Sequence, residues 1–269
     1  MSAEPVVASQ GWGVVHLFFH LRRDLVGNPE SAARDFAARL DAFDERRPYQ
    51  VLAFSVLGQK ADLGLMALGP DLAVLDAFTA EIAASPLGAA LVPAASYVSL
   101  TELSEYTPTK EDESWRLVEE EGLAEGSAEH AAALGRFEER MATYAGHRLH
   151  PRLPRRKLLS FYPMSKRRQG GDNWYTLDYD TRRRMMAGHA EVGRAYRGRV
   201  LQLVTGSVGL DDWEWGITLL ADDPKALKDI VYDMRFDQVS ARFGEFGPFV
   251  TGLVLRPADL MRRLGVRAG

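Results

Sequence analysis

Three side chains along one strand-like stretch combine groups that could carry out redox and anion-binding chemistry. Tyr162, Met164 and Lys166 recur at every second position, so a β-strand would project all three from one face. A phenol can be oxidised, and an ammonium group beside it can hold a carboxylate. The alternative is an edge strand in which the tyrosine packs and the lysine extends its charge into water.

A single histidine on a helical stretch is the second candidate. Helical spacing places His189 on one face with Met185, Met186, Gly193 and Tyr196. A lone histidine on such a face is usually a core residue, whereas a flat cofactor stacked on the helix would use it as a ligand. A glycine would clear space for that cofactor, but close helix packing explains Gly193 equally well.

Three other histidines are expected to have no role in chemistry. His16 and His20 stand four residues apart in a strand pattern, so they face the same way and are expected to be structural. His130 lies in a glutamate-rich helical stretch and is expected in solvent. The chain has no HExxH or His-x-His metal motif, and no dinucleotide, phosphate-loop or GxSxG signature.

Composition excludes several classes of site. The 269 residues include no cysteine, which rules out disulfides, thiolate-bound zinc, iron–sulfur clusters and a cysteine nucleophile. A formal net charge of −4 argues against nucleic acid as the main partner, although arginine and lysine clusters between residues 152 and 184 could form a local anion-binding wall. No apolar run approaches the roughly 20 residues of a membrane span and no signal peptide is evident, so a cytoplasmic location is expected.

The elements that must position these residues follow the same order twice. The first copy has the β-α-β-β-α-β order of a ferredoxin-like fold, and the second copy starts about 150 residues later. The ranges predicted for the first copy are 11–21, 29–46, 49–57, 63–68, 71–84 and 96–103. Those of the second copy are 158–164, 180–196, 199–206, 213–220, 224–234 and 249–255.

We therefore predict an α+β protein in which two ferredoxin-like halves form one two-sheet barrel. The expected boundaries are 1–110 for the first half and 157–269 for the second. Residues 111–156 between them would form a connector with two charged helical stretches and a Pro/Arg-rich end.

A tandem RNA-binding protein is an alternative to consider, because residues 242–250 imitate an RNA-recognition octamer and that module has the same strand and helix order. In this chain, however, the aromatic residues fall in the fourth strand of the copy rather than the third. Pro248 stands where a central strand should donate a hydrogen bond, and the first half has no equivalent aromatic platform. No nucleic acid partner is expected.

Short motifs between residues 162 and 247 occur together in a recognisable order. They are residues 162–168, 173–175, 185–189, 193–194, 202, 206–207, 211–212, 214–216, 232–237 and 240–247. Taken together, these motifs resemble those of the chlorite dismutase-like haem proteins, and most of all the coproheme decarboxylases of bacterial haem synthesis. In the first half, only residues 96–106 are similar. The family's fold of two ferredoxin-like halves agrees with the repeat found in the pattern.

The resemblance implies roles for the candidate residues. His189 would be the proximal iron ligand, and Tyr162 would be oxidised by the peroxide-activated iron. The resulting radical would take hydrogen from a propionate β-carbon before carbon dioxide leaves. Lys166 would hold and orient one propionate. The other implied contacts are Arg148 and Ser240 to further propionates and Met164 to the porphyrin.

The reaction implied is oxidative decarboxylation of iron coproporphyrin III (coproheme) to haem b by hydrogen peroxide, usually in a homopentamer. Gln202 would occupy the distal position, where chlorite dismutases have an arginine. Its neutral side chain disfavours breakdown of an anionic oxidant such as chlorite. His150 stands where the decarboxylases tend to have a tyrosine. The alternatives are a haem-binding or haem-transfer protein without turnover, and chlorite breakdown.

Overall fold

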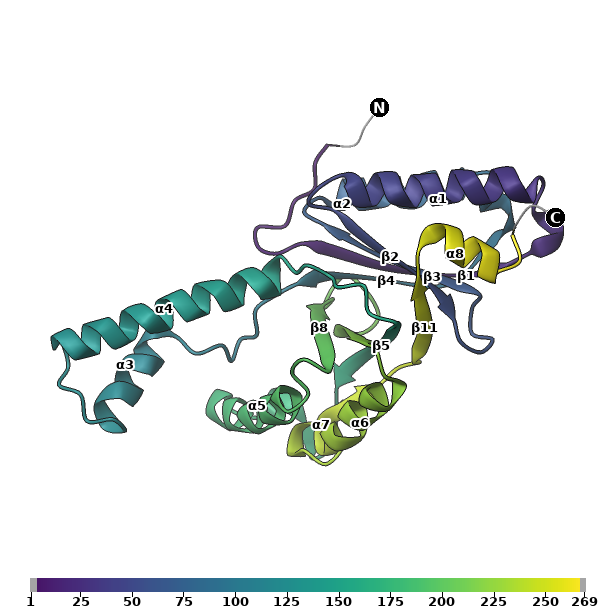
Figure 1. Ribbon diagram of the computed structural model, residues 1–269. Helices are drawn as coiled ribbons and strands as arrows, with labels where there is room; N and C mark the ends of the chain where they lie inside the picture. Colours follow the sequence, from purple (N-terminus) through teal and green to yellow (C-terminus); the bar gives the residue numbers. More distant parts are fainter. Residues whose placement is uncertain (1–3, 267–269) are drawn as a thin grey trace. The chain divides into compact units, whose positions relative to one another are not determined.

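The computed structural model describes residues 4–266 and contains the predicted repeat (Figure 1). Both helices of the first copy begin close to the predicted positions, because they carry clear start signals, whereas its last strand begins at residue 91 and not at 96 as predicted. Asn28 accepts a hydrogen bond from Ser31 N ahead of Pro29, and Asp71 accepts one from Ala73 N. Its elements are β1 (Gly13–Leu21), α1 (Pro29–Glu45), β2 (Gln50–Val56), β3 (Leu63–Gly69), α2 (Leu72–Ala83) and β4 (Leu91–Thr101).

The second copy has the same order with short insertions. Its main elements are β5 (Leu158–Lys166), α5 (Tyr179–Arg194), β8 (Val200–Gly206), β9 (Trp215–Ala221), α6 (Pro224–Met234) and β11 (Val250–Leu255). The additional elements, which the sequence pattern did not predict, are β6 (Arg168–Gln169), β7 (Asp172–Asn173), α7 (Gln238–Phe243), β10 (Gly244–Phe246) and α8 (Pro257–Arg263). All five are too short to show a periodic pattern of apolar residues.

One antiparallel sheet joins the two halves into a closed barrel. The first half has the strand order β4-β1-β3-β2 and the second has β11-β5-β9-β8. Strand β2 pairs with β11, β4 pairs with β8, and β10 extends the edge of β5 beside β11. The predicted α+β fold with two ferredoxin-like halves is confirmed; the two predicted sheets are hydrogen-bonded to each other and form one closed sheet.

The inside of the barrel is apolar and aromatic, with one histidine buried in it. His16 on β1 is 0% exposed, and its ring centroid lies 4.1 Å from that of Phe161 on β5. Its Nε2 lies 2.9 Å from the Thr218 hydroxyl, whereas Nδ1 has no hydrogen-bond partner. Burial lowers the pKa of His16 to about 3, so this histidine is neutral. His20, further along β1, is half-exposed and lies 3.8 Å from Asp62.

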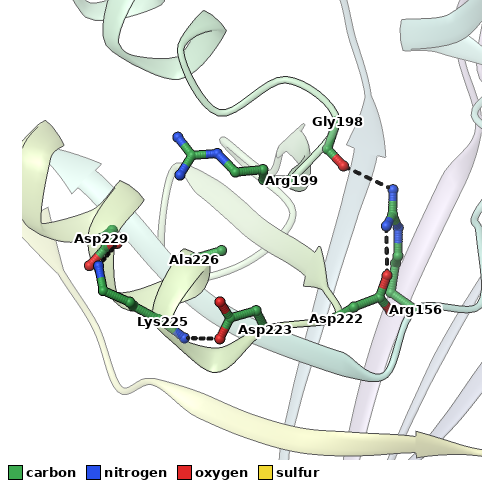
Figure 2. Close-up of a pocket in the computed structure, with 8 residues that line it drawn as sticks. All are labelled: Arg156, Gly198, Arg199, Asp222, Asp223, Lys225, Ala226 and Asp229. Carbon is green, nitrogen blue, oxygen red and sulfur yellow. Dashed lines mark hydrogen bonds and ion pairs between the residues drawn. The ribbon is translucent and has the colours of Figure 1, made fainter.

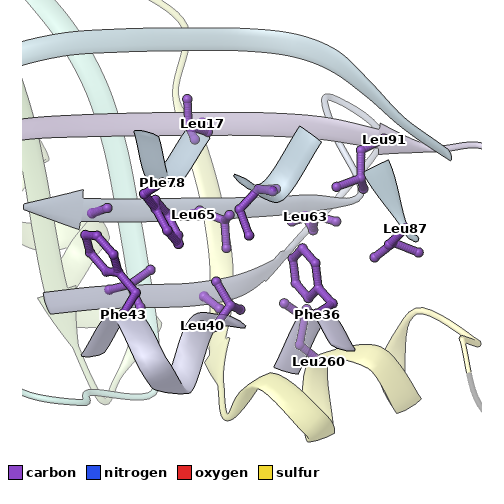
Figure 3. Packing of buried hydrophobic residues seen from close by; sticks show 14 of the residues in the cluster. Leu17, Phe36, Leu40, Phe43, Leu63, Leu65, Phe78, Leu87, Leu91 and Leu260 are labelled. Atoms are coloured by element: carbon purple, nitrogen blue, oxygen red, sulfur yellow. The ribbon is translucent and has the colours of Figure 1, made fainter. Parts of the chain in front are cut away.

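Helices cover the outside of each half of the barrel, with α1 and α2 on one side and α5, α6 and α7 on the other (Figure 1). In the first half, α1 contributes Phe36 and Leu40, both 0% exposed, to a continuous apolar core. Leu260 of α8 completes this core, as Figure 3 shows. Burying each such side chain stabilises the fold by about 1.5–3 kcal/mol.

Residues 102–152 form a separate compact unit of two helices, α3 (Lys110–Glu119) and α4 (Ala128–Leu149). A reciprocal pair of hydrogen bonds between Thr109 and Asp112 caps α3, and Ser127 caps α4. The prediction that His130 is solvated is wrong. Its side chain is buried where α3 packs on α4, and Nε2 lies 3.0 Å from the Ser114 hydroxyl.

None of the helices within residues 4–266 is both long enough and apolar enough to cross a membrane.

Candidate functional site

Strand β5 presents a buried phenol on the outer face of the second half. Tyr162 is 4% exposed, and its ring stacks on Phe249 with the centroids 4.3 Å apart. Its hydroxyl makes no hydrogen bond to any residue between 4 and 266. Burial is the sole cause that raises the pKa of Tyr162 well above its ordinary value. The phenol is therefore protonated at neutral pH and tied to no partner.

Four residues further along β5, Lys166 is also buried. It is 7% exposed, and its Nζ lies 4.8 Å from the centroid of the Trp174 ring. It forms no ion pair with the residues that the structure describes. Burial lowers the pKa of Lys166 to about 8, although the charges of Asp237 and Glu214 act in the opposite direction. An ammonium group without a carboxylate partner is prepared to receive an anion.

Helix α5 stands over this face without burying any of its own residues. Asp178 caps its start by accepting a hydrogen bond from Thr181 N. A Cβ atom added at Gly193 would lie 3.6 Å from Gln202 Oε1 and 3.4 Å from Met234 Cε. These are ordinary contact distances, so close packing alone does not require a glycine here. They also show that Gln202 of β8 faces α5.

His189 is not a core residue, since its side chain is 22% exposed and lines a cleft. Its Nδ1 lies 3.0 Å from Oδ2 of Asp237, the residue that caps α7. Nε2 makes no hydrogen bond within the described part of the chain. A carboxylate on Nδ1 fixes the ring and leaves Nε2 as the nitrogen that can bind a ligand.

Asp237 is held as a carboxylate by several donors. Burial alone would raise its pKa, but the hydrogen bond and charge of His189, with hydrogen bonds from Ser240, lower the pKa to about 2. The backbone N–H groups of Val239 and Ser240 donate to Oδ1 at 2.8 and 3.1 Å. Ser240 is itself only 8% exposed, so the hydrogen bonds that it donates to Asp237 are partly shielded from water.

The cleft beside His189 has a volume of about 590 Å³. Its walls come from α5 and from the start of α7, and Phe236 at its edge is 71% exposed. Two guanidinium groups, those of Arg184 and Arg242, also line it. The residues that line this cleft do not include Tyr162, Met164, Lys166 or Gln202.

A second pocket of about 260 Å³, shown in Figure 2, lies at the end of α5 and the start of α6. Both acidic and basic side chains line it. Arg156 and Asp222 form an ion pair of 2.7 Å, and Lys225 and Asp229 form another. The sequence pattern did not single out this pocket.

Six of the seven residues proposed for the site lie in the second half. They are Tyr162, Met164 and Lys166 on β5, Gln202 on β8, His189 on α5 and Ser240 on α7. Asp237 contacts both His189 and Ser240, and Gln202 faces the helix that carries His189. Arg148 belongs to the other unit, near the end of α4.

Asp237 is the site residue that the sequence pattern missed. An aspartate one position ahead of residues 238–243 is a helix-start signal, but nothing in the sequence pairs it with a histidine 48 residues earlier.

Comparisons with known proteins agree with this architecture. A sequence model described as "Chlorite dismutase" matches residues 29–255. The structure of a haem-binding protein from Thermus thermophilus is 33% identical, with a TM-score of 0.77 over 98% of this chain and 99% of that chain. A mutant chlorite dismutase from Candidatus Nitrospira defluvii is 16% identical and shares the fold, with a TM-score of 0.69 over 96% of each chain. From the match over most of its length, we conclude that this chain belongs to the chlorite dismutase family.

Proposed function

We propose that this protein binds coproheme and decarboxylates two of its propionates, with hydrogen peroxide as the oxidant and haem b as the product. The observation that carries the proposal is the pairing of Tyr162 and Lys166 on one strand. One is a buried phenol without a hydrogen bond, and the other is a buried ammonium without an ion pair. The 33% identical relative that binds haem supports an iron porphyrin as the ligand.

The residues present fit an iron porphyrin with several carboxylates. His189 offers Nε2 to iron while Asp237 holds Nδ1, an arrangement that makes a histidine a stronger ligand. Helix α5 buries none of its residues, as expected of a helix whose inner face is kept for a ligand. In this proposal Lys166, Ser240 and Arg148 bind carboxylates, Met164 contacts the porphyrin, and Gln202 lies on the distal side.

The bound iron porphyrin supplies the site where peroxide is converted into an oxidant for the protein. Each propionate that becomes a vinyl group releases carbon dioxide, one proton and two electrons. One hydrogen peroxide accepts the two electrons with two protons and becomes two water molecules. The balance is therefore one peroxide for each propionate.

Tyr162 transfers the hydrogen in this proposal. Because its pKa is raised by burial, the phenol gives up its proton together with its electron and becomes a neutral radical. No hydrogen bond holds the oxygen, so it is free to take a hydrogen atom from the propionate β-carbon. Lys166, four residues away, orients that propionate by its carboxylate.

Mass spectrometry of the purified protein with coproheme tests the proposal. Adding peroxide should convert coproheme into haem b through a singly decarboxylated intermediate. Tyr162→Phe should bind coproheme normally but slow its conversion by about 100-fold or more, the scale of losing a positioned proton-transfer group. Tyr97→Phe is the matched control, because Tyr97 is equally buried but hydrogen-bonds to Ser207 inside the barrel.

Three outcomes would contradict the proposal. If Tyr162→Phe produced haem b at the parent rate, the role of that phenol would be wrong. Coproheme that binds without peroxide-dependent loss of mass would instead indicate haem binding or transfer. Oxygen release from chlorite would indicate the activity of the chlorite dismutases, which the neutral Gln202 disfavours because it gives an anionic oxidant no charge partner.

A further inference from the structure

A second buried phenol lies at the end of the helix that carries His189. Tyr196 is 5% exposed and belongs to the same buried cluster as Tyr162. Its hydroxyl donates a hydrogen bond to Oδ2 of Asp233 on α6. The guanidinium carbon of Arg199 lies 4.5 Å from the centroid of its ring.

The three buried phenols around β5 differ in what their hydroxyl groups contact. The Tyr162 hydroxyl has no partner among the described residues, and that of Tyr97 contacts the Ser207 hydroxyl at 2.5 Å and the Trp213 carbonyl at 3.2 Å. Of these three hydroxyl groups, that of Tyr196 is the one that donates a hydrogen bond to a carboxylate. A phenol that loses an electron becomes a strong acid, so a carboxylate that can take its proton in place favours the oxidation.

Tyr196 also lies close in the chain both to His189 and to Arg199, a residue of the polar pocket in Figure 2. Tyr196 follows His189 by seven residues and stands two residues beyond Arg194, where α5 ends. On its other side, Arg199 lines the polar pocket of Figure 2 together with Arg156 and Lys225. Arg199 forms no ion pair with residues 4–266, so it can contact a small polar molecule in that pocket.

We propose that Tyr196 and Asp233 form a second redox pair, which passes single electrons from a small reductant in the polar pocket to peroxide at the haem site. This inference rests on the proposed function. In each event Tyr196 loses one electron, and its phenolic proton moves to Asp233, leaving a neutral tyrosyl radical and a carboxylic acid. The reductant then returns the electron and Asp233 returns the proton.

Two such electrons, with two protons, reduce one hydrogen peroxide to two water molecules. The pair would thus consume oxidising equivalents when no propionate is within reach of Tyr162. The class of reductant expected is a small polar one-electron donor, for which ascorbate serves as the probe.

Freeze-quench electron paramagnetic resonance tests the assignment. The protein is loaded with ferric haem b and mixed with peroxide in a Tyr162→Phe background. A tyrosyl radical should remain in this variant and fall at least tenfold when Tyr196→Phe is added. Adding Tyr97→Phe should leave it unchanged. Asp233→Asn keeps a hydrogen-bonding side chain but removes the base, and should lower the yield to a similar extent.

The inference would be overturned if the radical persisted after both Tyr162→Phe and Tyr196→Phe, or if Asp233→Asn left its yield unchanged. Circular dichroism shows whether a variant is misfolded. If Tyr196→Phe is misfolded, the radical yield of Asp233→Asn tests the proposal instead. Ascorbate should shorten the lifetime of the radical, and Arg199→Gln should slow that decay. If the radical decayed equally fast with and without Arg199→Gln, the pocket would not be where the reductant binds.

The two proposals fail in different ways. A Tyr196 radical formed without any conversion of coproheme would defeat the proposed function alone. Haem b produced normally by a protein without a Tyr196 radical would defeat the redox pair alone. A protein that binds no haem would defeat both.

Discussion

Helices α1 and α5 occupy the same place in the two halves, each between the first and second strands of its repeat. Helix α1 has 17 residues and buries Ala32, Phe36, Leu40 and Phe43. Helix α5 has 16 residues and buries none. Where α1 has fully buried apolar side chains, α5 has only half-buried ones such as Met185 and Val192, together with His189 and Gly193. The difference shows that α1 is part of a closed core, whereas α5 leaves its side chains accessible, as our proposal of a ligand beneath it requires.

The sheet faces beneath the two helices differ in the same way. The face in the first half is apolar and closed by α1, α2 and α8. The face in the second half combines apolar residues with two buried polar groups: in the described residues, the Tyr162 hydroxyl makes no hydrogen bond, and the Lys166 ammonium forms no ion pair but lies over the Trp174 ring. Both halves thus contain an apolar cluster, but only the cluster of the second half includes a buried phenol next to a buried ammonium group on the same strand.

The largest effect should come from opening the first-half core. Phe36→Ala should lower the free energy of unfolding by about 3–5 kcal/mol, because it leaves a cavity where a fully buried ring was. Urea denaturation followed by circular dichroism measures this change. A loss below about 1 kcal/mol would contradict the conclusion that α1 packs into the core of the first half.

The barrel interior, which both halves share, should respond to acid. His16 has a folded pKa of about 3, against 6.5 when unfolded, so only the unfolded chain gains this proton between these values. Stability should therefore fall as the pH drops below 6.5, by up to about 1.4 kcal/mol per pH unit from this group. Urea denaturation between pH 7 and pH 5 measures the slope.

His16→Gln is the variant that isolates this effect, since glutamine can still bond to Thr218 but does not titrate. Its stability should depend less steeply on pH over that range. If the free energy of unfolding depended on pH equally steeply in the parent and the variant, His16 would not be the group that destabilises the protein in acid.

In the second half, Lys166 should control the affinity for carboxylates. Lys166→Met keeps the length of the side chain but removes its charge, and should weaken coproheme binding about tenfold at pH 7. Because the pKa of Lys166 is about 8 rather than 10.5, affinity in the parent should also fall as the pH rises through 8. Quenching of tryptophan fluorescence measures both effects.

The control for this prediction is Lys157→Met, at an exposed lysine just ahead of β5. It should bind coproheme like the parent. Parent binding that stays constant between pH 7 and 9 would argue against Lys166 as the anion partner.

The smallest effect should come from α5 itself. Met185→Ala removes a half-buried side chain that lines the cleft beside His189. Without ligand, it should change the free energy of unfolding by less than about 1 kcal/mol, since no packed core is disrupted. A loss as large as that of Phe36→Ala would mean that α5 is packed as tightly as α1.

Much of the fold could be predicted because the repeat is made of elements long enough to show periodicity. Asn28 and Pro29 predict the start of α1. The spacing of Tyr162 and Lys166 predicts that both lie on one face of β5. Helix α7 was missed because its six residues lie in a segment rich in glycine and phenylalanine. Although a barrel was predicted, the strand pairs that join its halves, β2 with β11 and β4 with β8, are far apart in sequence and no local pattern encodes them.

The site was predictable only in part, for a related reason. A pattern can place His189 on a helix face, but it cannot show that Asp237 from another element meets it. The burial of His130 was likewise hidden, because it depends on how α3 packs on α4. Resemblance to a family proposed roles for Tyr162 and Lys166, whereas their lack of partners could be seen only in the folded structure.

The central claim is that the second half holds a haem iron through His189, and absorption spectroscopy tests it most directly. Titrating the protein with ferric coproheme should give a five-coordinate spectrum that His189→Ala loses and added imidazole restores. His20→Ala, at an exposed histidine of the first half, should leave the spectrum as in the parent. An unchanged spectrum in His189→Ala would contradict the account.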